Sequence, residues 1–313
     1  KLGIRSIICM PAGAPLSKVE ATRNYGAEVV LVPGVYDDAA AEATRLVEEK
    51  GYTFAHPFND EYVMAGQGTI GLEILEQLPD VDQVVVPIGG GGLIAGIACA
   101  IKSLKPSCKV IGVQAAGAAS MYTSRREGHP VTLPSVSTIA DGIAVKRPGD
   151  LTFEMVQKYV DEIVTVKEDE IATAILALME DQKTVAEGAG ATTIAAVMFG
   201  KVNATDKKTV CVVSGGNIDV TTISRVITKG LNKTGRLTEI STKIVDKPGN
   251  LIKLLQVIAK TGANIINITH SREDKNSDVV SCIVTMVLET LNLQHVDDIE
   301  RELIAGGYEI IKK

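Results

Sequence analysis

The sequence predicts an α/β fold in which parallel sheets are covered by helices, followed by a smaller ferredoxin-like unit of βαββαβ order. Up to residue 230, short apolar runs alternate with segments of helical period, as in sheets whose strands are joined by helices. The runs 84–86 and 210–213 are apolar at every position, which indicates strands buried on both faces. Beyond residue 236 the order becomes strand, helix, strand, strand, helix and strand.

The composition narrows the class of protein. The 313 residues are enough for two or three domains, and 45% are apolar but only 4% aromatic, so an aliphatic core is expected. The net charge of −6 without basic blocks argues against a nucleic-acid partner. No apolar run is long enough to span a membrane. Five cysteines without a CxxC pair indicate reduced thiols in a cytoplasmic protein.

In the larger part, short apolar runs predict the strands and segments of helical period predict the helices. Strands are expected at 6–10, 28–32, 83–88, 109–114, 162–166 and 209–214. Helices are expected at 17–25, 37–50, 62–78, 92–104, near 118–126, and at 168–182, 190–200 and 220–229. Gly51 and Pro79 end two of these helices. The polar stretch 229–236 is expected to be a linker.

The smaller part begins with a strand at 238–245 and the turn Asp246–Asn250. The helix that follows carries an apolar face of Leu251, Leu254, Leu255 and Ile258. Strands are then expected at 264–270 and 278–289, joined by a polar tip at 271–277. A last helix carries Val296, Ile299 and Leu303, and a last strand covers 308–311.

Four successive glycines, Gly89–Gly92, lie between an apolar strand and the helix that starts near Leu93. N–H groups without side chains at a helix N-terminus favour an anion, so we interpret the tract as a phosphate site and not as a mobile loop. It lacks the Lys-Ser/Thr end of a Walker A loop. It also fits a dinucleotide fingerprint, but the next strand ends in Gln114 where that site requires an acid. A compact phosphomonoester fits best.

A second glycine-containing turn follows the strand at 209–214 and begins with Ser214. A serine at the end of a parallel strand points into the crevice where α/β proteins bind ligands, and its hydroxyl can bond a heterocyclic nitrogen. Alternatively, Ser214 belongs to the N-cap region of the helix that Asp219 begins. The spacing leaves both interpretations open.

Several motifs, taken together, resemble a known family. They are Ala65–Ile70, Pro87–Gly96, Thr138–Gly142, Glu187–Ala191 and Ser214–Asn217, and they stand in the order found in fold-type-II pyridoxal-phosphate enzymes. The sequence is most similar to threonine dehydratases (threonine ammonia-lyases), with serine racemases as near relatives. The resemblance implies part of a small domain at 1–57, a large cofactor-binding domain at 58–232, and a linker with an ACT regulatory domain at 233–313.

The resemblance also implies site residues. Gly89, Gly90, Gly91 and Gly92, with the N–H of Leu93, would hold the phosphate of pyridoxal 5'-phosphate. Ser214 would face the pyridine nitrogen and Glu187 would lie near the ring, although Glu187 also suits a helix N-terminus. Phe58 would line the substrate side, although packing alone explains an aromatic residue there.

For the ACT-like part, the resemblance implies an amino-acid effector, with isoleucine the leading choice. The N–H groups of the turn and first helical residues would receive its carboxylate. The residues concerned are Asp246, Pro248, Gly249, Asn250 and Leu251, with Asn264 expected close by. Open sheet edges favour a homodimer or homotetramer. The alternative is that Pro248 and Gly249 form only a tight turn in a dimerisation surface.

The sequence departs from the family in its catalytic lysine. No Ser-Phe-Lys-like motif for the Schiff-base lysine and no Ser-Gly-Asn-His-like motif is present, and both are expected upstream of Lys1. Lys18 opens a helix and is expected to be solvated, so the chain alone is expected to be inactive. The acidic cation ligands of serine racemase are replaced by Gln114 and Ser120, so no such metal is expected, while a backbone-ligated monovalent cation stays open.

The family implies deamination of L-threonine to 2-oxobutanoate and ammonia, with L-serine giving pyruvate. Two alternatives remain. One is a serine racemase-like enzyme, and the other is an amino-acid sensor without catalysis, which the missing lysine favours and the retained glycine tract opposes.

Overall fold

The structure, a computed structural model, describes residues 3–14, 16–34, 36–273 and 278–311. The chain divides into two compact units. The first comprises Lys1–Ile171 and Ala186–Asp219, and the second comprises Ala172–Val185 and Val220–Lys313. Among the described residues, no helix is long and apolar enough to cross a membrane.

The first unit opens with two parallel strands, β1 (Ile7–Pro11) and β2 (Glu28–Val32), in the register Ile7 to Glu28. The helices α1 (Leu16–Asn24) and α2 (Tyr36–Lys50) follow the two strands. These four elements confirm the strand-helix alternation expected at the start of the sequence.

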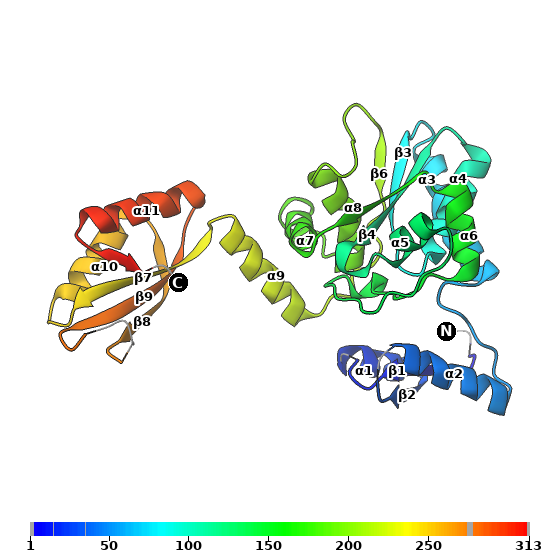
Figure 1. Cartoon of the computed structure of the whole chain (residues 1–313), viewed down its shortest axis with the longest axis horizontal. Coiled ribbons are helices and arrows are strands. Elements are labelled where there is room, and N and C mark those ends of the chain that lie inside the picture. Colours follow the sequence, from blue (N-terminus) through cyan, green and yellow to red (C-terminus); the bar gives the residue numbers. More distant parts are fainter. Residues whose placement is uncertain (1–2, 15, 35, 274–277, 312–313) are drawn as a thin grey trace. The chain divides into compact units, whose positions relative to one another are not determined.

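The main sheet of the first unit is parallel throughout, as predicted. Its strands are β5 (Glu162–Val166), β4 (Lys109–Ala115), β3 (Gln83–Pro87) and β6 (Thr209–Cys211), in that spatial order. In Figure 1 the sheet lies between α8 (Gly188–Met198) on one side and α3 (Glu61–Gln77), α4 (Gly92–Leu104) and α6 (Asp150–Tyr159) on the other. The remaining helices are α5 (Ser120–Glu127), α7 (Glu168–Gln182), and the short 3-10 turns η1 (Ala116–Ala118) and η2 (Asp141–Ile143).

Small residues bring α3 and α4 into close contact. A Cβ on Gly96 would lie 2.1 Å from the carbonyl oxygen of Met64, so the two backbones meet where no larger residue fits. The aliphatic core between the sheet and these helices includes Val84, Val86 and Ile97, all fully buried. This rigid layer fixes the start of α4, where the glycine tract lies.

The larger part differs from the prediction most clearly at α6, β6 and α9 (Val220–Lys233). Helix α6 was not foreseen, and β6 ends at Cys211 and not at residue 214. The expected linker 229–236 is mostly helical, because α9 runs over Val220–Lys233. Gly230 does not break α9 because it packs against Leu176 of α7, where a Cβ would lie 2.5 Å from Leu176 Cδ2.

The second unit contains the predicted βαββαβ order. Its elements are β7 (Leu237–Val245), α10 (Asn250–Thr261), β8 (Asn264–Ser271), β9 (Ser281–Glu289), α11 (Leu293–Ala305) and β10 (Glu309–Ile311). The antiparallel sheet has the strand order β10-β7-β9-β8, which is that of the split ferredoxin-like plan. Both helices cover one face of the sheet over a buried aliphatic core, as Figure 1 shows. Part of the expected tip, 274–277, lies outside the described residues, and residues 278–280 form a turn before β9.

Candidate active site

The glycine tract joins the carboxyl end of β3 to the N-terminus of α4. Gly91 is the N-cap residue with φ of +102°, a conformation that residues other than glycine rarely adopt. Within the described residues, Gly89, Gly90 and Gly91 donate no backbone hydrogen bond, and the first N–H groups of a helix have no acceptor within it. The tract therefore presents a row of unpaired donors at the positive end of a helix.

Phe58 packs directly on this tract. A Cβ on Gly90 would lie 2.4 Å from Cδ2 of the Phe58 ring, and one on Gly92 would lie 2.9 Å from Phe58 Cβ. The same residues line one cavity of about 380 Å³, a size typical of small-molecule sites. Phe58 thus forms a wall of the cavity whose floor is the glycine tract.

The backbone of the tract is fixed by α6. The Thr152 hydroxyl donates to the carbonyl oxygen of Gly90 at 2.6 Å, and the N–H of Gly149 donates to the same oxygen at 3.3 Å. Thr152 is fully buried. Oδ1 of Asn59 accepts from the N–H groups of Leu151 at 3.0 Å and Thr152 at 3.3 Å, and so holds the first turn of α6 in place.

Ser214 lines the same cavity as the glycine tract, although the two lie far apart in the sequence. It lies beyond the end of β6 and well before α9, which begins at Val220, so it does not cap that helix. Gly190 permits this position, because a Cβ there would lie 2.6 Å from the carbonyl oxygen of Ser214.

Glu187 lines the cavity and is also the N-cap residue of α8. The prediction of a place at a helix N-terminus and the prediction of a place at the site therefore both hold for this residue. Its side chain makes no cap hydrogen bond, and its carboxylate accepts an N–H from Asn217 instead. Burial raises the pKa of Glu187, and the negative charge of Asp141 raises this pKa further, while Asn217 and Lys18 oppose the shift. Glu187 is therefore a carboxyl group that keeps its proton to a higher pH than usual.

Lys18 is not fully solvated as expected. Its Nζ lies 3.1 Å from Oδ2 of Asp141, and its side chain is 35% exposed. Asp141 lines the cavity beside Gly142 and Glu187. Gln114 is buried and bonds to backbone groups: its Nε2 donates to the carbonyls of Ile88 and Ala118, and its Oε1 accepts from the N–H of Tyr122.

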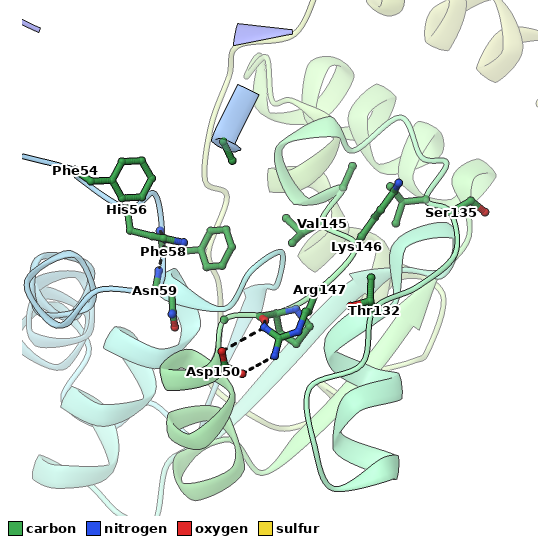
Figure 2. A pocket seen from close by; sticks show the side chains of 15 residues that line it. Phe54, His56, Phe58, Asn59, Thr132, Ser135, Val145, Lys146, Arg147 and Asp150 are labelled. Carbon is green, nitrogen blue, oxygen red and sulfur yellow. Dashed lines mark hydrogen bonds and ion pairs between the residues drawn. The ribbon is translucent and has the colours of Figure 1, made fainter. Parts of the chain in front are cut away.

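A larger cavity of about 800 Å³ shares Phe58, Ala144 and Val145 with the first. Figure 2 shows His56, Phe58 and Asn59 on one side of it and Val145 and Lys146 on the other. Nδ1 of His56 accepts from the N–H groups of Phe58 at 3.2 Å and Asn59 at 2.8 Å. Desolvation lowers the pKa of His56, which favours the neutral ring that this acceptor role requires. His56 thereby sets the direction in which Phe58 enters the cavity.

In the second unit, the residues predicted to bind an effector do not all lie together. Asp246, Pro248 and Gly249 form the turn before α10, and Gly249 has φ of +88°. The side chain of Asn250 already donates to the carbonyl oxygen of Val245 at 3.1 Å, while Leu251 lies in the first turn of α10.

The expectation that Asn264 lies beside this turn is wrong within one chain, because of the strand register. Val245, next to the turn, pairs with Ser281 at one end of β9, whereas Asn264 pairs with Glu289 at the other end. The amide of Asn264 donates to Oε2 of Glu289 at 3.2 Å.

Sequence reasoning missed three residues that shape the first cavity, namely Asn59, Asp141 and Thr152. The motif Thr138–Gly142 contained Asp141, so its pattern was a usable signal. Thr152 belongs to the unforeseen α6, and Asn59 acts on residues far away in the sequence, so no local pattern reveals either of them.

The cavity fits one kind of cofactor. Unpaired N–H groups and a glycine with positive φ suit a phosphate, while a neutral hydroxyl and a protonatable carboxyl at the same cavity suit a heterocyclic ring. The fold and the cavity define a pyridoxal-phosphate-dependent enzyme, and residues 1–216 match the family described as "Pyridoxal-phosphate dependent enzyme".

Known proteins narrow this class. The chain is 53% identical over 308 residues to L-threonine ammonia-lyase of Thermotoga maritima, covering 98% of this chain and 77% of that protein. The processed threonine deaminase isoform 2 of Solanum lycopersicum has a similar structure, with a TM-score of 0.68 and 40% identity, over 72% of this chain and 62% of that one. Maize serine racemase gives a TM-score of 0.67 and 36% identity, over 74% and 71% of the two chains. The chain belongs to the threonine ammonia-lyase (threonine dehydratase) family.

Proposed function

We propose that the first unit binds pyridoxal 5'-phosphate and serves the deamination of L-threonine to 2-oxobutanoate and ammonia, with L-serine giving pyruvate. The observation that carries the proposal is the single cavity that collects the glycine tract, Phe58, Glu187 and Ser214 from distant parts of the chain. The identity to threonine ammonia-lyase of Thermotoga maritima supports the choice of substrate.

The residues divide the work by chemistry. The N–H groups of Gly89–Gly92 and Leu93 hold the phosphate. The hydroxyl of Ser214 bonds the pyridine nitrogen without protonating it, unlike a carboxylate. When bound, the cofactor supplies the electron sink that weakens the bonds at the substrate's α-carbon. Glu187 holds a proton beside the ring, and Phe58 excludes water from the substrate side.

The lysine that links the cofactor in this family is proposed to lie outside these 313 residues, because no lysine here stands in a Ser-Phe-Lys-like motif. A chain of these residues alone therefore binds the cofactor without a covalent link and does not turn over threonine. Borohydride reduction with pyridoxal phosphate then leaves no specific label in the cavity, whereas a stoichiometric label at Lys18 with deamination overturns this part of the proposal.

The function itself is tested with the protein carrying its native upstream residues. Incubation with L-threonine is expected to yield 2-oxobutanoate and ammonia in equal amounts. The likeness to maize serine racemase makes racemisation the second candidate, and chiral analysis of products from L-serine separates the two. D-serine as the main product, with little ketoacid, contradicts the proposal.

We further propose that residues 233–313 form an ACT-type regulatory domain that binds a small amino acid, with isoleucine the leading ligand. The support is the βαββαβ order and the turn at Gly249. The N–H of Asn250 donates to the carbonyl of Lys247 at 3.2 Å, while the N–H groups of Leu251 and Ile252 donate no hydrogen bond among the described residues and stay available for a carboxylate. Among the described residues, edge strand β8 pairs with a neighbouring strand on one side alone, and pairing such edges between copies gives a homodimer or homotetramer.

A further inference from the structure

Three side chains of different chemistry meet at one end of the sheet in the second unit. Cys282 of β9 pairs in register with Ile244 of β7, and His270 of β8 pairs with Val284, two residues beyond Cys282. Directly paired residues share a face, and alternate residues along a strand also share one. Ile244, Cys282 and Val284 all belong to the core under the helices, so His270 projects onto that face as well. Asp246, two residues past Ile244, completes the group.

The ligand atoms of the three residues lie close together. Nε2 of His270 is 2.8 Å from Sγ of Cys282 and 3.9 Å from Oδ1 of Asp246. One such atom from each residue lies within 4.8 Å of the other two. Cys282 is buried, while the side chains of His270 and Asp246 are 32% and 30% exposed. The group therefore has a buried sulfur at its base and an opening toward solvent.

We propose that Asp246, His270 and Cys282 form a binding site for a divalent transition-metal ion, with Zn²⁺ as the best match. A thiolate, an imidazole and a carboxylate are the three ligand types that Zn²⁺ takes in proteins. The thiolate disfavours Mg²⁺ and Ca²⁺, which prefer oxygen ligands. Three protein ligands leave a fourth tetrahedral position, which on the open side of the group is taken by water.

The group needs only small changes to take up the ion. Arg272 now donates to the carboxylate of Asp246 from Nε at 2.6 Å and from Nη2 at 3.3 Å. Its side chain is 70% exposed, and a dication bound at Asp246 takes the place of the positive charge that Arg272 supplies there. The ion also separates Nε2 of His270 from Sγ of Cys282, because both atoms then bond the metal and no longer each other.

Metal uptake must also displace a proton. A cysteine ligates a metal as its thiolate, so the thiol of Cys282 gives up its proton when the ion binds. Binding breaks the S–H bond, forms the metal–sulfur bond, and passes the proton to the buffer. The net charge of the site therefore rises by one for each ion bound at Cys282, and affinity falls as the pH is lowered.

Titration of the full chain with Co²⁺, followed by absorption, tests the site, because cobalt reports thiolate ligation by a charge-transfer band in the near ultraviolet. One equivalent is expected to give this band, and Zn²⁺ is expected to remove it. Cys282→Ala abolishes the band, and His270→Gln or Asp246→Asn weakens binding by at least about tenfold. Cys108→Ala, which changes a buried cysteine of the other unit, leaves the titration unchanged.

Calorimetry in two buffers of different ionisation enthalpy measures the proton released with each Zn²⁺. His270→Gln keeps the test valid if Cys282→Ala lowers stability, because the side chain of His270 is 32% exposed and is not one of the residues that form the aliphatic core. The proposal is overturned if no thiolate band forms, if His270→Gln binds as tightly as the parent, or if Cys108→Ala removes the band.

Discussion

The ring of Phe58 lies so close to Gly90 that a side chain on Gly90 has no space: its Cβ would be 2.4 Å from Cδ2 of the ring. Gly90 thus has two roles: its N–H stays unpaired among the described residues, and the absence of a side chain allows the Phe58 ring to pack against its backbone. A change in the tract is therefore expected to affect both the phosphate site and the wall of the cavity.

Gly91→Ala is expected to weaken binding of pyridoxal phosphate strongly. Its φ of +102° costs a non-glycine residue about 1–3 kcal/mol, and its Cβ would lie 2.7 Å from Met121 Cε. Equilibrium dialysis with the cofactor measures the loss. Gly66→Ala is the control, because it lies in α3 with open space around its Cβ. Normal cofactor occupancy in Gly91→Ala would exclude the tract as the phosphate site.

Thr152→Val is expected to lower both cofactor affinity and stability. The change removes the 2.6 Å donor of the Gly90 carbonyl in a fully buried place and leaves the longer bond from the N–H of Gly149, at a cost of about 0.5–1.5 kcal/mol. Thermal unfolding and dialysis are measured together. Thr123→Val removes a similar hydroxyl–carbonyl bond within α5, away from the cavity, and is expected to change stability alone. Equal cofactor affinity in the two variants would contradict a role of Thr152 in shaping the tract.

Glu187→Gln is expected to stabilise the protein at neutral pH. The raised pKa means that the folded state holds a proton that the unfolded state gives up first, so ionisation makes folding less favourable as the pH rises above the ordinary value of 4.5. The amide removes this cost and also the repulsion by Asp141. The melting temperature of Glu187→Gln should exceed that of the parent by an amount that grows from acid to neutral pH. The melting temperature of Glu154→Gln, a change at an exposed residue, should follow the parent at each pH. A constant difference across pH would show that the charge of Glu187 is not the cause.

Gly249→Ala is expected to abolish amino-acid binding by the second unit. Its φ of +88° shapes the turn that opens the N-terminus of α10. Gly262→Ala is a matched control, because Gly262 ends the same helix with φ of +80° and also has open space around its Cβ. Calorimetry on the full chain with isoleucine, valine, threonine and serine, in the presence of a metal chelator, compares the two. The proposed effector site is ruled out if Gly249→Ala still shows heat of binding. It is also ruled out if the folded parent shows no heat of binding with any of the four amino acids.

The sequence predicts those elements whose signals are local. Helix α4 has the bounds expected, because its glycine start and apolar run lie within its own segment. Helix α6 is not predicted, because its N-cap residue Gly149 has no side chain that could mark a helix start. The first N–H groups of α6 instead donate to Asn59, which is far away in the sequence. Residues 229–233 read as a linker because the packing of Gly230 on Leu176 cannot be seen in a window of sequence.

The candidate site shows the same division. Motif order predicts that Gly89–Gly92, Glu187 and Ser214 share one cavity, and the structure places them there. The distance of Asn264 from the turn at Asp246 depends on the strand register, which the apolar pattern of β8 and β9 does not set uniquely.

The second unit includes residues 172–185, which are separated in the sequence from the rest of it by part of the first unit. Most of α7 therefore belongs with α9 and the antiparallel sheet, and the chain crosses between the units three times. A fragment that begins at residue 220 would lack Leu176, the residue that packs against Gly230. The surface of α9 that Leu176 covers would then be exposed. Fusing residues 220–313 to the C-terminus of another enzyme would therefore not transfer the whole unit. The other enzyme would also have to supply a helix equivalent to residues 172–185 from within its own sequence.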